Sequence, residues 1–179
     1  AYLIWALLEL YQADYDPRDL KTALELTRDM VKYFWDEESA GFFLYGSDGE
    51  KLIHRPKEIY DGALPSGNSV AALNLLRLAR LTGDAGLEEK AVQLMSHFAG
   101  QAADIPGAHA FYMMSLLYYL VPGSEVSIVG SRKQPDTIQM LDEISSAYHP
   151  FTHIILKEEG RDPSEYEVLS GFHSLPGDK

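Results

Sequence analysis

The chain has 179 residues, of which 46% are hydrophobic, and a formal net charge of −12 at pH 7. This length suits one ordinary domain, and the apolar fraction supports a packed core instead of a disordered chain. The acidic balance disfavours nucleic acids and anionic membranes as partners, because both attract basic surfaces. Since no cysteine occurs, disulfides and thiolate chemistry are excluded, and a cytoplasmic location is expected.

The first two predicted helices are patterned differently. Residues 1–13 are apolar nearly all round, with Glu9 as the main exception, which predicts a helix that is buried on most sides. Because no capping residue precedes it, we expect the chain to begin inside a helix of a longer protein. The second helix starts with Asp16 as its cap and Pro17 as its first residue. It carries one apolar stripe, which is formed by Leu20, Ala23, Leu24, Thr27, Val31 and Phe34.

The next three predicted helices continue this alternation. The third begins near Ser66 and ends at Gly83, and its few polar positions predict burial on most sides. The fourth, residues 85–99, is amphipathic, and the fifth, residues 107–120, is again apolar nearly all round. We therefore predict a mainly α fold in which inner and outer helices, linked as hairpins, form two concentric layers.

The connections between these helices follow from the layer arrangement. If the first, third and fifth helices run the same way, the connections 36–66 and 100–107 reach the same end of the inner layer. The loop that contains Asp61 should then share a face with His109. Within the longer connection, two strand-like runs flank a turn at residues 47–49, which predicts a β-hairpin insertion.

After residue 122 the pattern changes to strand, helix and strand. The segments EVSIVG, PDTIQMLDEISSAY and THIILKE predict one parallel β-α-β unit with a right-handed crossover. We therefore divide the chain into helical hairpins over residues 1–122 and a small C-terminal α/β segment over residues 123–179. Two parallel strands make a poor sheet, and the last residues show no further strand pattern. The second segment is therefore expected to be truncated.

Residues 57–84, with the sequence KEIYDGALPSGNSVAALNLLRLARLTGD, resemble the YyaL family, also called the spermatogenesis-associated, thioredoxin-domain-containing family. The runs FWDEESAGFFLY, PGAHAFYM and EVSIVG fall in the family's order. The resemblance implies a six-hairpin (α/α) toroid similar to N-acylglucosamine 2-epimerases, of which this chain supplies the last part. It also implies partners within the same protein, namely the missing upstream toroid helices and a thioredoxin-like domain.

The loop at residues 57–69 holds most of the candidate binding residues. Asp61, Ser66 and Asn68 can satisfy the backbone N–H groups of a helix start, and this structural role alone explains their presence. Sugar recognition uses the same residue types, because it needs amides, carboxylates and aromatic faces. The candidates for substrate binding are Lys57, Tyr60, Ser66, Asn68 and Trp35.

Three residues are candidates for acid–base catalysis. Glu58 and Asp61 could serve as acid and base in glycosidase-like or epimerase-like chemistry if one carboxyl has a raised pKa, and a solvated charged loop is the alternative explanation. The resemblance makes His109 a candidate proton carrier, because toroidal epimerases use inward-facing histidines. A core histidine bonded to the backbone is the alternative. The other histidines show no metal-ligand spacing, so neither a metal nor a cofactor is expected.

These observations leave three functional hypotheses open. The first is a carbohydrate-directed site, either sugar-binding or enzymatic. The second is a non-catalytic structural or partner-binding scaffold that serves the thioredoxin-like domain, and the third is a helical solenoid that binds peptides. A partial toroid leaves apolar surface uncovered, so we expect the isolated chain to oligomerise.

Overall fold

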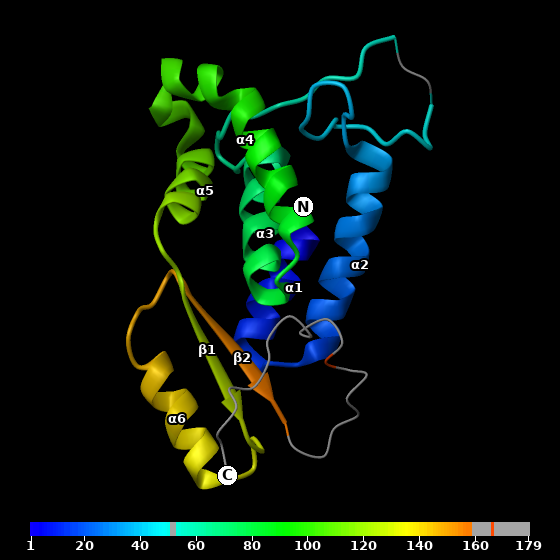
Figure 1. Cartoon of the computed structure of the whole chain (residues 1–179). Coiled ribbons are helices and arrows are strands. Elements are labelled where there is room, and N and C mark those ends of the chain that lie inside the picture. Colours follow the sequence, from blue (N-terminus) through cyan, green and yellow to red (C-terminus); the bar gives the residue numbers. More distant parts are fainter. Residues whose placement is uncertain (51–52, 159–165, 167–179) are drawn as a thin grey trace.

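The computed structural model describes residues 1–50, 53–158 and 166. It is mainly helical, with a small parallel sheet that lies, together with α6, below α3, α4 and α5 in Figure 1. None of the described helices is long and apolar enough to cross a bilayer. The elements in chain order are α1 (Tyr2–Asp14), α2 (Pro17–Phe34), α3 (Gly67–Thr82), α4 (Ala85–Asp104), the 3-10 turn η1 (Pro106–His109), α5 (Ala110–Leu120), β1 (Ser124–Val129), α6 (Pro135–Ser145) and β2 (Thr152–Lys157).

The helix ends follow from the local sequence. The Asp16 carboxylate accepts a hydrogen bond from the backbone N–H of Arg18, and the Ser66 hydroxyl accepts one from the backbone N–H of Ser69, each at 3.0 Å. α3 ends at Gly83, whose φ of 73° lies in the left-handed region that glycine adopts without strain. These predicted caps are confirmed.

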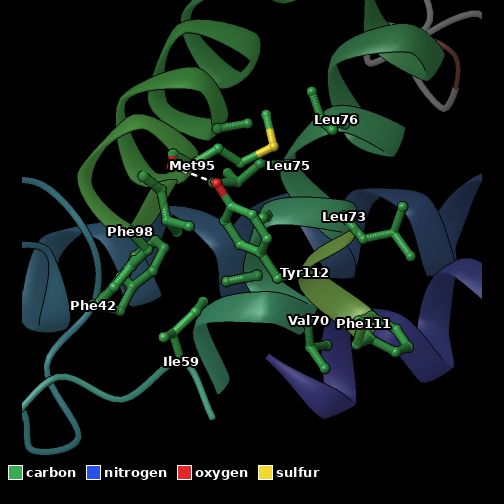
Figure 2. Packing of buried hydrophobic residues seen from close by; sticks show 14 of the residues in the cluster. Phe42, Ile59, Val70, Leu73, Leu75, Leu76, Met95, Phe98, Phe111 and Tyr112 are labelled. Atoms are coloured by element: carbon green, nitrogen blue, oxygen red, sulfur yellow. Dashed lines mark hydrogen bonds between the residues drawn. The ribbon is translucent and has the colours of Figure 1, made fainter. Parts of the chain in front are cut away.

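The helices form two hairpins, α1 with α2 and α3 with α4, and α5 packs on α3 as a further helix. α3 contacts α1 on one side and α5 on the other, while α2 packs on α1 and α4 packs on α3. Figure 2 shows the largest group of buried side chains, in which residues of α3 such as Val70 and Leu75 meet Met95 and Phe98 of α4 and Tyr112 of α5. The contacts of α1 with α2 and of α3 with α4 agree with the predicted hairpins, whereas two concentric layers and closure into a toroid stay predictions.

The first turns of α1, α3 and α5 lie at the same end of the molecule, as the sequence predicts. The Tyr2 hydroxyl donates a hydrogen bond to the carbonyl of Pro65, directly before α3. The backbone N–H of Asp61 donates to the carbonyl of Ala108 at 2.8 Å, directly before α5. The two connections therefore meet.

The predicted β-α-β unit is confirmed. β1 and β2 pair in parallel from Ser124 opposite Thr152 to Val129 opposite Lys157, and α6 lies between them in the chain. Because side chains alternate along a strand, β2 buries its two faces against different neighbours. Ile155 packs among residues of the helices, while its neighbours in the strand pack against α6. The division of the chain at residue 122 stays a prediction.

The predicted β-hairpin is wrong for the residues that the structure describes. Phe42 forms an isolated antiparallel bridge with Trp35 at the end of α2, and residues 43–50 and 53–56 form no strand. The backbone N–H of Leu44 does reach the carbonyl of Pro56, at 3.0 Å, so the segment closes as a loop. Phe42 pairs with Trp35 and Asn68 and not with the residues after the turn. No regular strand pairing therefore forms around residues 47–49.

The predicted burial of the first and fifth helices on most sides is also wrong. α1 exposes Leu3 and Leu10 by 62% and 52%, and α5 exposes Leu120 by 66%. Each helix packs on its neighbours along one face, and no described residue covers the opposite face. α5 also begins later than predicted, because residues 106–109 form a 3-10 turn.

Candidate functional site

Asp61, a predicted catalytic residue, uses its carboxylate to hold backbone groups. One oxygen accepts the N–H of Ser66 at 2.7 Å, and the other accepts those of Phe111 and Tyr112 at 2.8 and 3.0 Å. α5 needs this external partner, because its N-cap residue His109 makes no capping hydrogen bond through its side chain. Asp61 thus joins the starts of α3 and α5.

Asn68 has a comparable structural role between the loop and α3. Its side-chain oxygen accepts the N–H of Phe42 at 2.7 Å, and its Nδ2 donates to the carbonyls of Phe42 and Glu58 at 2.9 and 2.8 Å. The residue is only 2% exposed. Ser66 is the cap of α3, so both predicted binding residues are occupied by backbone contacts.

The other predicted loop residues do not converge on a cavity. Lys57 is held by Asp36, at 2.8 Å, and by the Ser39 hydroxyl, at 2.7 Å, and this ion pair lowers the pKa of the Asp36 carboxyl well below its usual range. Glu58 and Tyr60 are exposed. Trp35, a further predicted binding residue, is buried edge-on against Phe42.

His109 is buried, with 4% of its surface exposed. Its Nδ1 lies 2.9 Å from the carbonyl of Ile105, and its Nε2 has no hydrogen-bond partner among the described residues. Among the described residues, it does not line the cavities of about 530, 370, 360 and 230 Å³. Its proton-carrying role therefore stays a prediction.

The structure places a different set of side chains around a cavity of about 530 Å³ on the face that α1, α3 and α5 share. The connection between α6 and β2 forms the remaining wall. The lining residues come from α1 (Trp5, Glu9 and Gln12), α3 (Leu73 and Arg77), α5 (Phe111, Met114, Leu117 and Tyr118) and residues Tyr148, His149, Pro150, Phe151, Thr152 and His153. We call this space the inner-face cavity.

Helical spacing explains why these residues meet. In α1 the lining positions are i, i+4 and i+7, and in α3 they are i and i+4, so each set lies along one helix face. Because α3 packs between α1 and α5, the three faces adjoin. The cavity is therefore a product of the layer arrangement and not of one loop.

Glu9 connects the polar groups of the inner-face cavity. Its Oε1 accepts hydrogen bonds from the indole N–H of Trp5 at 2.9 Å and from Arg77 at 2.6 Å. The Arg77 side chain is 13% exposed and that of Glu9 is 59% exposed. Gln12 adds a buried amide nitrogen that has no hydrogen-bond partner among the described residues. These groups give the cavity a carboxylate, a guanidinium and an amide.

The far side of the cavity contains a buried tyrosine–histidine pair. The Tyr118 hydroxyl lies 2.5 Å from Nε2 of His153, and both residues are at most 5% exposed. Burial lowers the pKa of His153 to about 4, with further lowering by Arg80 and Arg77, so the ring is neutral at neutral pH. Burial raises the pKa of Tyr118 to about 12. At neutral pH this hydrogen bond therefore joins a neutral tyrosine and a neutral histidine.

Lowering the pH from neutral to about 4 is expected to destabilise the fold through His153. Its pKa falls from the ordinary 6.5 in the unfolded chain to about 4 in the folded chain. Between these values only the unfolded chain binds a proton at this position, so the stability is full above about 6.5 and declines as the pH falls toward 4. The expected total loss is on the order of 3 kcal/mol.

Denaturant unfolding at a series of pH values measures this effect as a difference between variants. His153→Gln should flatten the decline between neutral pH and about 4, whereas the exposed His54→Gln should retain it. If the two variants and the parent chain share one pH dependence, the contribution assigned to His153 is absent.

A second cavity, of about 370 Å³, lies between α1, α2 and residues 42–44. Its lining is mainly apolar, with Met30, Phe34 and Phe43 among its residues. Over residues 1–50 and 53–158, no group of three or more His, Asp or Glu side chains is placed to hold a metal ion. Asp29, Tyr33 and Asn68 also line this second cavity, whereas the inner-face cavity adds a guanidinium and two imidazoles to its polar groups.

The sequence contained a signal for the inner-face cavity. Glu9 is the main exception in an otherwise apolar helix, and Arg77 is one of the few polar positions of a mostly buried helix. An ionisable residue in such a pattern needs a partner or an aqueous cavity. Pairing the two exceptions would have predicted their contact across α1 and α3.

No protein-family model matches the chain. The chain is 34% identical over 167 residues to spermatogenesis-associated protein 20 from Homo sapiens, and equally to the proteins of that name from Rattus norvegicus and Mus musculus. Each alignment covers 93% of this chain and 21% of the relative. An uncharacterised protein from Caenorhabditis elegans is 31% identical over 133 residues, which are 74% of this chain and 18% of that protein.

These relatives confirm the family resemblance that residues 57–84 carry, and they extend it over most of the chain. The chain spans about a fifth of the length of the curated relatives that it matches, as the 21% coverage shows. The activity, substrates and partners of the longer proteins do not follow from this similarity.

Proposed function

We propose that this chain, a homologue of one region of spermatogenesis-associated protein 20, binds a carbohydrate in the inner-face cavity. The single observation that carries the proposal is the composition of the cavity wall, which combines aromatic rings with hydrogen-bonding groups. The resemblance to toroidal sugar epimerases adds support, but the site differs from the loop at residues 57–69.

The chemistry of the wall suits a polyhydroxylated ring. Trp5 and Phe111 pack with their ring centroids 5.0 Å apart, and Tyr118 and Phe151 lie 6.1 Å apart. Such aromatic surfaces stack on the apolar C–H face of a sugar, while carboxylate, guanidinium and amide groups bond its hydroxyls. The volume of about 530 Å³ falls in the range of small-molecule sites.

Binding fits the cavity better than hydrolysis. Glycoside hydrolysis commonly uses two carboxylates that flank the scissile bond. Glu9 is the one carboxylate among the lining residues that the structure describes, and Arg77 already holds it. We therefore assign sugar binding, and not acid–base catalysis, to these residues.

Ligand-observed saturation-transfer NMR with a panel of neutral hexoses tests the proposal. At least one hexose is expected to bind the chain, and Trp5→Leu should weaken that binding about tenfold because a stacking surface is lost. Tyr60→Leu is the matched control, since Tyr60 is exposed on the loop and does not line the cavity. Binding that depends on Tyr60 and not on Trp5 would contradict the proposed site.

A second candidate function, that of a structural or partner-binding scaffold, is favoured by apolar residues at both ends of the helical layer. Leu3 and Leu10 of α1 are exposed by 62% and 52%, and Leu120 of α5 is exposed by 66%. A groove of about 230 Å³ between α4 and α5 adds further apolar surface. We propose that further helices of a longer protein, and a thioredoxin-like domain, use these edges.

The isolated chain is expected to oligomerise through the same edges, because exposed apolar side chains favour association in water. Light scattering should give a mass above the 20.0 kDa of one chain. Leu3→Glu combined with Leu10→Glu should shift the population toward monomer, whereas the exposed Lys21→Glu on α2 should not. A parent chain that is a monodisperse monomer would contradict this expectation.

A further inference from the structure

We propose that the ligand of the inner-face cavity is an anionic monosaccharide, whose carboxylate or phosphate group binds beside Arg77. This inference rests on the proposed carbohydrate function and adds the charge of the ligand to it. It starts from a contrast in charge, since the chain as a whole carries −12 but the wall of the cavity is not acidic.

One guanidinium group lines this cavity and a second lies close behind its wall. Arg77 lines it, and Arg80 lies directly behind, with its guanidinium carbon 4.3 Å from the centre of the Tyr118 ring. Glu9 is the sole carboxylate among the described lining residues. Of the two histidines in the wall, His153 is neutral at neutral pH. Arg77 thus matches Glu9 within the described lining, and Arg80, which donates to the carbonyls of Tyr118 and Val121, adds positive charge behind it.

Arg80 and Arg77 shift the pKa values of the buried pair in the direction that positive charge requires. Arg80 and Arg77 each lower the pKa of His153, and each also opposes the burial that raises the pKa of Tyr118. Both effects are those of positive charge, which disfavours a protonated histidine and favours a tyrosinate. A negative ligand group in the cavity would be attracted by the same potential.

Arg77 has the chemistry to receive such a group. It bonds Glu9 through Nη1 at 2.6 Å, and no other hydrogen bond of its side chain forms among the described residues. A guanidinium has five N–H donors arranged to bond a carboxylate or a phosphate in a bidentate manner. At 13% exposure the side chain is sheltered from solvent, which strengthens a charge-assisted bond.

The experiment is calorimetric titration of the full 179-residue chain with glucose, glucuronate and glucose 6-phosphate, which share a ring and differ in charge. At least one of the two anions should bind about tenfold or more tightly than glucose. Tighter binding of glucuronate assigns a carboxylate ligand, and tighter binding of glucose 6-phosphate assigns a phosphate ligand. Added salt should reduce this preference, because a charge contact is screened and stacking is not.

Arg77→Gln should abolish the preference for the anion, and Arg77→Lys should retain part of it. The control is Arg28→Gln, which makes the same change of charge at an exposed position of α2 outside the cavity and should leave the preference intact. If Arg77→Gln fails to fold, as circular dichroism would show, the salt dependence of the parent chain decides the question. Equal binding of all three sugars overturns this inference and leaves carbohydrate binding standing, whereas binding of none overturns both.

Discussion

Replacing Asp61 by alanine is expected to lower the free energy of unfolding by about 3 to 4 kcal/mol. The carboxylate accepts the backbone N–H groups of Ser66, Phe111 and Tyr112. Alanine would leave all three donors without this partner at the starts of two helices. Denaturant unfolding measures the loss, and hydrogen exchange should show faster exchange of the Phe111 and Tyr112 amides.

The control for this prediction is Glu58→Ala, which removes a carboxylate from an exposed position of the same loop. Its effect should stay within about 0.5 kcal/mol, because its side chain makes no contact that stabilises the described structure. Equal losses in the two variants would refute the capping role of Asp61. The pair also separates structure from catalysis, since the sequence alone made both residues candidate acid–base groups.

Asn68→Asp should be among the most destabilising single changes, with an expected loss of about 3 to 5 kcal/mol. The Nδ2 group donates to the carbonyls of Phe42 and Glu58. An aspartate oxygen at this position would face two carbonyl oxygens without a proton, and the site is 2% exposed. Thermal unfolding and denaturant unfolding both measure the effect.

Gln101→Glu provides the matched amide-to-acid change on an exposed position of α4, and it should change the stability by about 0.5 kcal/mol or less. The loss of stability in Asn68→Ala should lie between those of the other two variants, because alanine removes the hydrogen bonds without adding a charge. A stable Asn68→Asp variant with the parent's fold would show that the amide network does not hold the loop to α3.

Most of the fold could be predicted because its signals are local. Asp16, Ser66 and Gly83 set helix ends through caps and a left-handed turn, and these operate within a few residues. The parallel β-α-β unit could be predicted equally well, since two apolar runs flank an amphipathic helix. The contact between the two connections followed from helix direction alone, and the hydrogen bond between Asp61 and Ala108 confirms it.

The errors arose where a residue's partner lies far away in the sequence. The turn at residues 47–49 suggested a hairpin, but Phe42 pairs with Trp35 and Asn68, and no local pattern shows that competition. The apolar positions of α1 and α5 suggested burial on most sides, yet composition does not reveal whether a neighbour covers each face.

The site residues predicted on the loop stay predictions, and the sequence could not settle their role for the same physical reason. A loop dense in Asp, Ser and Asn looks alike whether these residues bond a ligand or the backbone, and the distances around Asp61 and Asn68 show that they bond the backbone. The inner-face cavity draws on three helices and on residues 148–153, which are separated by long stretches of chain. Only Glu9 and Arg77, as polar exceptions, pointed to it.

The most direct measurement uses the two tryptophans of the chain, because each belongs to one of the two possible sites. Trp5 lines the inner-face cavity with its indole N–H on Glu9, and Trp35 is buried beside Phe42 at the loop. Titrating the ¹⁵N-labelled chain with the sugar anion that binds best should shift the indole signal of Trp5 and leave that of Trp35 in place. A shift of Trp35 with an unchanged Trp5 would place the ligand at the loop and contradict the account.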